Sequence, residues 1–150
     1  MTDTNDFYDL ERFIQAQAKD FAIALAEINN GEKKSHWMWY IFPQLAGLGH
    51  SAMSQRYAIQ SAAEAKAYLN HSVLGPRLIQ CVKVLLEIDG RSAHEIFGSP
   101  DDMKLRSCAT LFASITPKGS VFECLLEKYF HGKQDRKALD LLKNTNKSME

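Results

Sequence analysis

The residue types best suited to chemistry gather in one segment, residues 32–57, which reads EKKSHWMWYIFPQLAGLGHSAMSQRY. Both tryptophans of the chain, Trp37 and Trp39, lie in it, after Lys33 and Lys34 and before a glycine-rich turn. Interleaved aromatic, basic and amide side chains can stack on a planar ligand and pair with its charge. Because residues two apart on a helical turn face different ways, we expect one tryptophan in the core and the other near a groove.

The turn at residues 47–51, Gly-Leu-Gly-His-Ser, is a second candidate. Its glycines permit a sharp backbone turn, and Ser51 can cap a helix expected over residues 52–59. Free backbone N–H groups at a helix start attract a phosphate or carboxylate, on which Trp37 or Trp39 would stack. An ordinary glycine turn with a serine cap explains the same residues without a ligand. The basic side chains that would add positive charge, if the fold brings them close, are Lys33, Lys34, Arg56 and Arg77.

The remaining candidates for catalysis have structural explanations as well. His36 can act as a general acid or base, but a histidine packed beside tryptophan accounts for it equally. Lys104 and Ser107 are three residues apart, as in some Ser–Lys nucleophile pairs, yet small polar contacts between close helices need the same residues. No two histidines have the spacing of a helical zinc site. We therefore expect no metal or cofactor, and the sequence indicates no reaction class.

The three cysteines, Cys81, Cys108 and Cys124, form no Cys-x-x-Cys motif. Each lies in an apolar stretch, where a free cysteine behaves as a small hydrophobic residue. We interpret them as reduced core thiols of a cytoplasmic protein.

Composition limits the remaining classes. The 150 residues include 18 Lys+Arg and 18 Asp+Glu, with 45% hydrophobic residues, as in one soluble globular domain. No apolar run has the length of a membrane helix, and the polar, acidic N-terminus is neither a signal nor a transit peptide. Zero net charge argues against nucleic-acid binding. We expect a single domain over 1–150, with a core over 7–143 and frayed ends at 1–6 and 144–150.

Hydrophobic periodicity and capping signals predict helices almost throughout. An apolar stripe with spacings of three and four predicts the first helix over 10–29, and a short helix must end before Pro43. Ser61, Ser92 and Ser120 each precede a glutamate by three residues, as in capping boxes, and Ser99 precedes a proline and two acids. The fold class is therefore all-α, a compact single-domain array of about six to eight helices, several of them short. Further helices are expected near 61–70, 73–88, 92–97, 100–116, 121–131 and 136–143.

The run KSHWMWYIFPQ at residues 34–44 resembles the DUF1810 family. The similarity continues through residues 47–57, through HSVLGPRL at 71–78 and through GSPDD at 98–102, so it covers nearly the whole chain. It implies a small bacterial all-helical protein without an established function. The residues that it and the local chemistry nominate for ligand binding are Lys34, His36, Trp37, Trp39, Gln44, Gly49, Ser51, Ser54, Tyr57, Arg77, Lys104 and Ser107.

Three functions are compatible with these observations. We favour binding of a small anionic or nucleotide-like ligand in a pocket between residues 33–57 and the helix of residues 104–112. This pocket is expected to hold His36, Gln44, Ser51 and one of the tryptophans. The alternative is a protein-interaction module with an aromatic surface. Nucleic-acid binding is the third, and the mild basic excess near the C-terminus, which includes Lys133, Arg136 and Lys137, adds little to it. The oligomeric state stays open.

Overall fold

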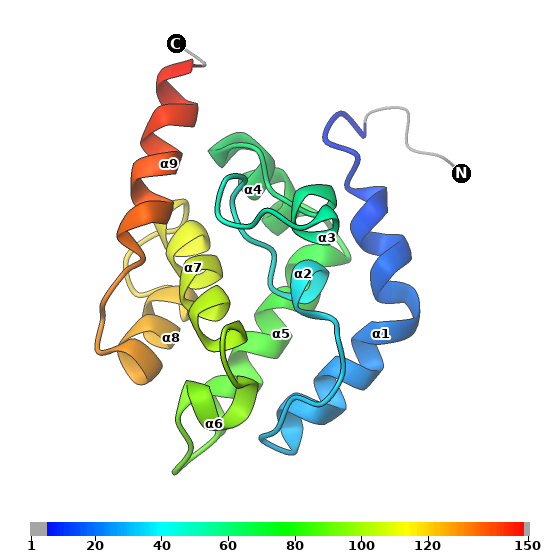
Figure 1. Cartoon of the computed structure of the whole chain (residues 1–150), viewed down its shortest axis with the longest axis vertical. Helices are drawn as coiled ribbons and strands as arrows, with labels where there is room; N and C mark the ends of the chain where they lie inside the picture. The colour runs from blue at the N-terminus through cyan, green and yellow to red at the C-terminus, as the bar shows by residue number, and fades with distance from the viewer. Residues whose placement is uncertain (1–5, 149–150) are drawn as a thin grey trace.

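The computed structural model describes residues 6–148, with side chains for residues 6–145. The described residues form nine helices and no strand, so the predicted all-α class is confirmed (Figure 1). Three helices have only four or five residues. The helices are α1 (Glu11–Asn29), α2 (Met38–Ile41), α3 (Ala52–Arg56), α4 (Ala62–Asn70), α5 (Leu74–Glu87), α6 (Ala93–Phe97), α7 (Asp101–Ser114), α8 (Val121–Phe130) and α9 (Arg136–Ser148).

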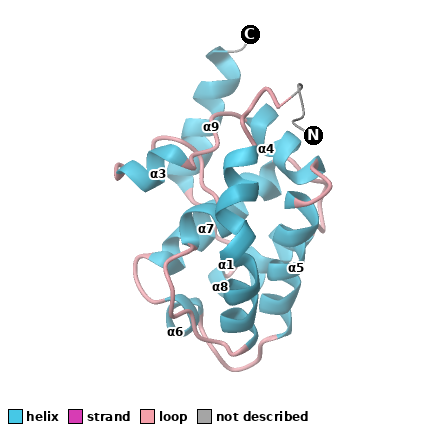
Figure 2. Cartoon of the chain, turned by 90° about the vertical axis from the view of Figure 1, so that its right-hand side faces the viewer, coloured by secondary structure: helices cyan, strands magenta, loops and turns pink. Residues whose placement is uncertain are grey.

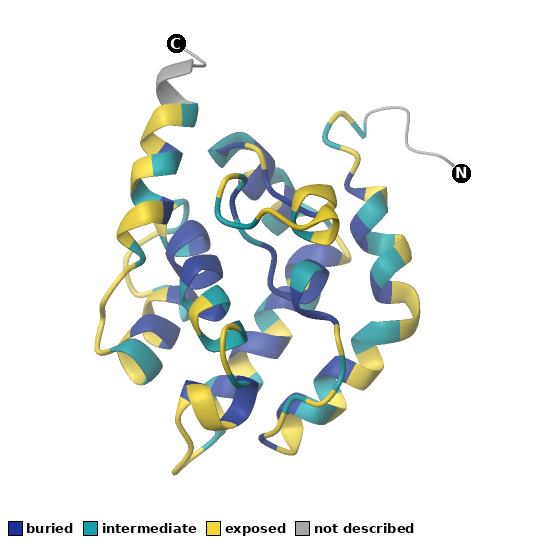
Figure 3. Cartoon of the chain, viewed as in Figure 1, coloured by how far each residue is buried: buried dark blue, intermediate teal, exposed yellow. Residues whose placement is uncertain are grey.

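The core is built around α5, which packs against α1, α4 and α8, while α7 packs against α8 (Figure 1). The inward face of α5 buries Leu74, Leu78, Val82 and Leu85, as its apolar periodicity predicts. Full burial of each such side chain contributes about 2 kcal/mol. Buried residues line the inner faces of the other long helices too, and exposed residues lie on their outer faces (Figure 3).

Residues 33–60 cross the molecule in front of α5 and carry the short helices α2 and α3 (Figure 1). In the view from the side, α3 and α5 lie on opposite sides of the molecule (Figure 2). Two backbone hydrogen bonds, from Ala46 N to Ile59 O and from Ile59 N to Gln44 O, close this segment on itself, both at 2.8 Å. Leu45 and Ile59 thereby form an isolated parallel bridge, which ends α3 at Arg56 instead of near residue 59.

The capping signals place the helix starts well, with three corrections. Ser120 caps α8 by accepting from Glu123 N, but its own N–H donates to Pro117 O, so the expected capping box is not completed there. Ser92 and Glu95 form a complete capping box, whereas Ser61 caps α4 but Glu64 binds the Gln60 N–H instead of completing the box. Ser99 does not cap α7: the N-cap position is Pro100, without a side-chain hydrogen bond.

Both ends are more ordered than expected where they are described. The Asp6 carboxylate accepts hydrogen bonds from the N–H groups of Leu10 and Glu11, so it anchors the start of α1. At the other end α9 continues to Ser148, past the expected end at residue 143. Of the frayed ends predicted at residues 1–6 and 144–150, residues 1–5 and 149–150 lie outside the described residues.

Two of the three cysteines are core residues. Cys81 and Cys108 are buried, and burial raises the pKa of the Cys81 thiol to about 12. Cys124 is exposed on α8, so its assignment to the core was wrong. Its neighbours Leu125 and Leu126 face inward, and the helical turn carries Cys124 to the outer face.

Candidate functional site

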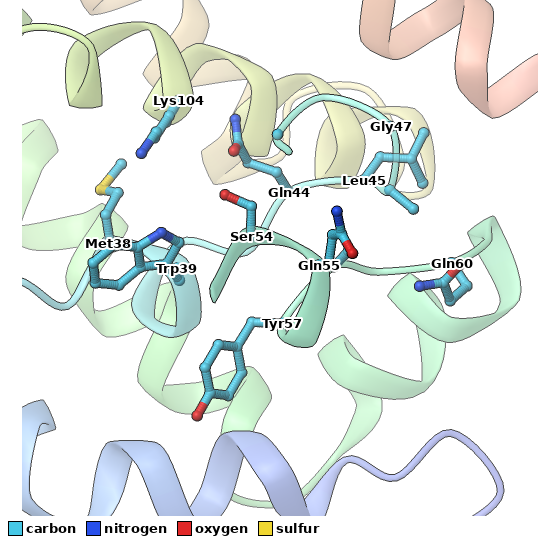
Figure 4. Close-up of a pocket in the computed structure, with 13 residues that line it drawn as sticks. Met38, Trp39, Gln44, Leu45, Gly47, Ser54, Gln55, Tyr57, Gln60 and Lys104 are labelled. Atoms are coloured by element: carbon cyan, nitrogen blue, oxygen red, sulfur yellow. The ribbon is translucent and has the colours of Figure 1, made fainter. Parts of the chain in front are cut away.

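A pocket of about 330 Å³ opens between the 38–60 segment and α7 (Figure 4). This is where the sequence predicts one. Six of the nominated residues line it: Trp39, Gln44, Gly49, Ser54, Tyr57 and Lys104. The others lining it are Met38, Leu45, Ala46, Gly47, Gln55, Ala58 and Gln60.

One wall of the pocket depends on a close approach of the glycine turn to α3. A Cβ atom on Gly49 would lie 2.6 Å from the Cβ and Oγ of Ser54, so only glycine fits there without a shift. Ser51 caps α3 by accepting a hydrogen bond from Ser54 N at 3.1 Å, and its hydroxyl donates to Ser54 Oγ at 2.8 Å. The cap therefore satisfies one of the N–H groups that the anion hypothesis for this turn would have used.

Arg12 of α1 fixes the position of the 38–60 segment. Its guanidinium donates to the carbonyl oxygens of Arg56 and Ala58, both at 2.8 Å, and pairs with buried Glu64 at 2.9 Å. A planar guanidinium with all of its donors engaged fixes these elements relative to one another. The end of α3 and the start of α4 are thus tied to α1.

Lys104 reaches from α7 toward Trp39, with its ammonium 5.7 Å from the centre of the indole ring (Figure 4). The same ammonium lies 3.5 Å from one carboxylate oxygen of Asp101, whose other oxygen meets Lys33 Nζ at 2.8 Å. Lys33 in turn lies 4.9 Å from the ring centre of Trp37. Each tryptophan ring therefore has one lysine ammonium over it, and Asp101 forms an ion pair with both lysines.

The pocket lining is rich in groups that form hydrogen bonds and carries no carboxylate. Three glutamine amides, those of Gln44, Gln55 and Gln60, and the Ser54 hydroxyl are both donors and acceptors. Lys104 supplies the positive charge. Tyr57 contributes its ring edge only, because its hydroxyl points away from Gln44 and Lys104 (Figure 4) and accepts a 3.4 Å hydrogen bond from Arg56 Nε.

Trp37, by contrast, belongs to a closed part of the structure. Trp37 is 0% exposed, and its indole N–H donates to Glu27 at 2.9 Å. Glu27 also accepts from the backbone N–H groups of Lys34 and Ser35 and from the Ser35 hydroxyl. Burial by itself would raise the pKa of Glu27, but these hydrogen bonds outweigh it and lower the pKa to about 2. The expectation of one buried and one groove-facing tryptophan is confirmed.

His36 and Lys34 are exposed and lie outside the pocket, as does Ser51. The prediction that the pocket holds His36 and Ser51 was therefore wrong. His36 precedes the lining segment and the turn into α2, whereas Ser51 lies within that segment but is used to cap α3.

Arg77 and Ser107 also have structural partners away from the pocket. Arg77 donates to Gln17 at 3.3 Å and lies over the ring of Phe21. Ser107 donates to the Asp135 carboxylate and to Met103 O, which fastens the loop before α9 to α7. These contacts explain both residues without a ligand.

Gln55 and Gln60 also line the pocket but were not predicted to do so. Gln60 follows the bridge between Leu45 and Ile59, which turns the chain after α3 back toward the pocket, and Gln55 lies on α3 itself, where no local pattern marks it. No group of three or more His, Cys, Asp or Glu side chains suited to a metal occurs among the described residues. None of the helices in the described part is both long and apolar enough to span a bilayer.

The large apolar side chains that are exposed come from five separate segments: Phe7, Ile23, Met53, Val73 and Met103. Protein interaction through an aromatic surface stays a prediction.

Comparison with known proteins gives a family and a fold. A family model described as "Protein of unknown function (DUF1810)" matches residues 7–142. The crystal structure of the conserved hypothetical protein Rv1873 from Mycobacterium tuberculosis is similar, with a TM-score of 0.90 and 48% sequence identity over 92% of this chain and 99% of that one. No curated protein matches the chain.

Proposed function

The chain belongs to the DUF1810 family, and from the geometry of its pocket we propose that it binds a small planar ligand with an anionic end. The observation that carries this proposal is the pairing of Trp39 and Lys104 across a 330 Å³ pocket without a carboxylate in its lining. A volume of this size suits a small molecule.

The aromatic face and the amides define the kind of ligand. A planar ring can stack on the half-buried Trp39 indole, while its polar edge exchanges hydrogen bonds with Gln44 and Ser54. Amide side chains match rings that present both donors and acceptors, such as nucleobases.

The charge arrangement favours an anionic end near Lys104. At 3.5 Å its contact with Asp101 is longer than the 2.8 Å contact between Asp101 and Lys33. When Lys104 turns to a ligand carboxylate or phosphate, Asp101 therefore keeps its stronger partner. The exchange leaves no carboxylate buried without a counter-charge, which would be costly.

We propose binding and not a reaction. Among the lining residues, the Tyr57 hydroxyl points away from the pocket, Ser54 Oγ has only the Ser51 hydroxyl as its side-chain partner, and Lys104 is paired with Asp101, so no nucleophile with a neighbouring base is assembled. The affinity would come from stacking, hydrogen bonding and one ion pair.

The test is a thermal-shift screen of the full chain with nucleotides, sugar phosphates and planar carboxylates, followed by titration calorimetry. Lys104→Met should weaken the binding of a hit about tenfold, the equivalent of one charged hydrogen bond. Lys83→Met, at an exposed position on α5, is the matched control and should bind as the native protein does. His36→Ala is a second control, because His36 lies outside the pocket.

Trp39 gives a direct readout of the same event. A ligand stacked on Trp39 should quench tryptophan fluorescence, and Trp39→Phe should remove the quenching while the buried Trp37 keeps its emission. Binding that survives both Lys104→Met and Trp39→Phe, or is lost equally in Lys83→Met, contradicts the proposal.

A further inference from the structure

A second group of basic side chains lies where α7, the loop after α8 and the start of α9 meet. They line a depression of about 400 Å³ formed by Arg106, Lys133, Gln134, Arg136 and Leu139. Three of these five residues are cationic and none is acidic. None of them lines the pocket beside Trp39, so this site is separate from the one described above.

Arg106 carries an unmet hydrogen-bonding group. Its Nε is buried and has no hydrogen-bond partner, and no other buried side-chain nitrogen or oxygen in the described part of the chain is left this way. The Arg12 guanidinium, by contrast, donates hydrogen bonds to two carbonyl oxygens and pairs with Glu64. A buried N–H without an acceptor is unfavourable, so Arg106 keeps a hydrogen-bonding group that the protein itself does not satisfy.

The first turn of α9 carries positive charge, which the helix dipole disfavours at that end. Arg136 and Lys137 occupy the first turn, which contains no acid, although the positive end of the helix dipole favours acids there. The nearby acid Asp135 is already engaged: one oxygen accepts from Lys137 N at 3.0 Å and the other from Ser107. Asp140 lies 3.8 Å from Arg136 Nε, and because both side chains are exposed this pair is weak.

The backbone around these cations is fixed. Asp135 N donates to Thr110 Oγ1 at 2.9 Å, and Lys133 N donates to Phe130 O at 2.9 Å. The loop that carries Lys133 and leads to Arg136 is therefore tied to α7 and to the end of α8. Because the backbone that carries these cations is already fixed, binding an anion costs less conformational entropy than it would on a free loop.

We infer that Arg106, Lys133 and Arg136 form a binding site for a phosphate group carried by a small molecule. Guanidinium groups match phosphate oxygens in geometry, and the Arg106 and Arg136 side chains each bring one to the depression. The depression exceeds the size of one phosphate, so it leaves room for a second phosphate or an attached organic group. This inference does not depend on the function proposed for the pocket beside Trp39.

The probe is inorganic pyrophosphate, titrated into the ¹⁵N-labelled full chain and followed by NMR, with inorganic sulfate as a comparison anion. We expect saturable shifts of the backbone amides of residues 133–137 at millimolar concentrations or below. Lys133→Gln, at an exposed position, should weaken binding about tenfold, and Arg106→Gln should do so at least as strongly. Lys83→Gln changes the net charge equally and should leave the affinity unchanged.

Three outcomes would overturn the inference. They are the absence of saturable shifts at residues 133–137, an equal loss of affinity in Lys83→Gln, and unchanged binding in Lys133→Gln. If Arg106→Gln does not fold, the Lys133 and Lys83 variants still decide the matter. Tighter binding of pyrophosphate than of sulfate would support a site built for phosphate.

Discussion

Trp37 and Trp39 are two residues apart, and each lies over a lysine that pairs with Asp101, yet their surroundings differ completely. The Trp37 side is closed: the ring is 0% exposed and its N–H is bound to Glu27. The Trp39 side is open, with its ring and Lys104 beside a pocket. One sequence motif thus supplies both a structural anchor and a candidate binding surface. Residue type alone does not separate the two roles.

The largest contrast should appear on removing each ring. Trp37→Ala should lower the free energy of unfolding by about 4 kcal/mol, because it leaves a cavity in the core and an unused acceptor on Glu27. Trp39→Ala should lower it by about 1 kcal/mol, because that ring already borders open space. Urea denaturation followed by far-UV circular dichroism measures both. Similar losses in the two variants would contradict the division into a closed and an open side.

A smaller effect is expected at the carboxylate that closes the Trp37 side. Glu27→Gln should lower the free energy of unfolding by about 2 kcal/mol at neutral pH, since a charged acceptor of several hydrogen bonds is lost. The pKa of Glu27 lies below its ordinary value of 4.5, at about 2. Its contribution is therefore complete above about pH 4.5 and is lost as the pH falls toward 2.

The pH dependence distinguishes this role from general destabilisation. Between pH 5 and pH 2 (about the range of the shift) the native protein should lose more stability than Glu27→Gln does. Glu123→Gln, at an exposed position on α8, serves as the control and should keep the native acid sensitivity. An unaltered acid profile in Glu27→Gln would show that Glu27 does not hold the segment through its charge.

The smallest effect concerns the wall of the open side. Gly49→Ala should lower the free energy of unfolding by about 1 kcal/mol, because its Cβ would lie 2.6 Å from Ser54. Ser54→Gly removes the clashing atoms, so the double variant should lose less than the sum of the two single changes. Chemical denaturation of the four proteins gives this coupling. Strict additivity would mean that the turn and α3 are not in contact as described.

Much of the fold could be predicted because its signals are local. The apolar stripe of α1 and the serine caps of α4, α6 and α8 act over three or four residues, and they placed these helices within one or two positions. The failure at Ser99 is also local, since the N-cap position falls one residue later, at Pro100, and the helix begins at Asp101.

The candidate site was predicted only in part. Trp39, Gln44 and Lys104 were found because their residue types are unusual or match a family motif, and the same reasoning nominated Arg77 and Ser107. Those two have partners distant in sequence, Gln17 and Asp135, which no local pattern reveals. Gln60 was missed for the converse reason, since the bridge between Leu45 and Ile59 brings it to the pocket, whereas Gln55 lies on α3, where no local pattern marks it.

The sequence by itself determined the helices, their buried apolar stripes and the segment with the candidate binding residues, because periodicity and capping depend on neighbours one or two turns away. Only the tertiary structure decided that Trp37 is buried and bound to Glu27 while Trp39 lies beside Lys104, and that Arg106, Lys133 and Arg136 line one depression. The physical reason is that a pocket is formed by the relative placement of distant segments. That placement follows from packing the whole core, which no single stretch of the chain encodes.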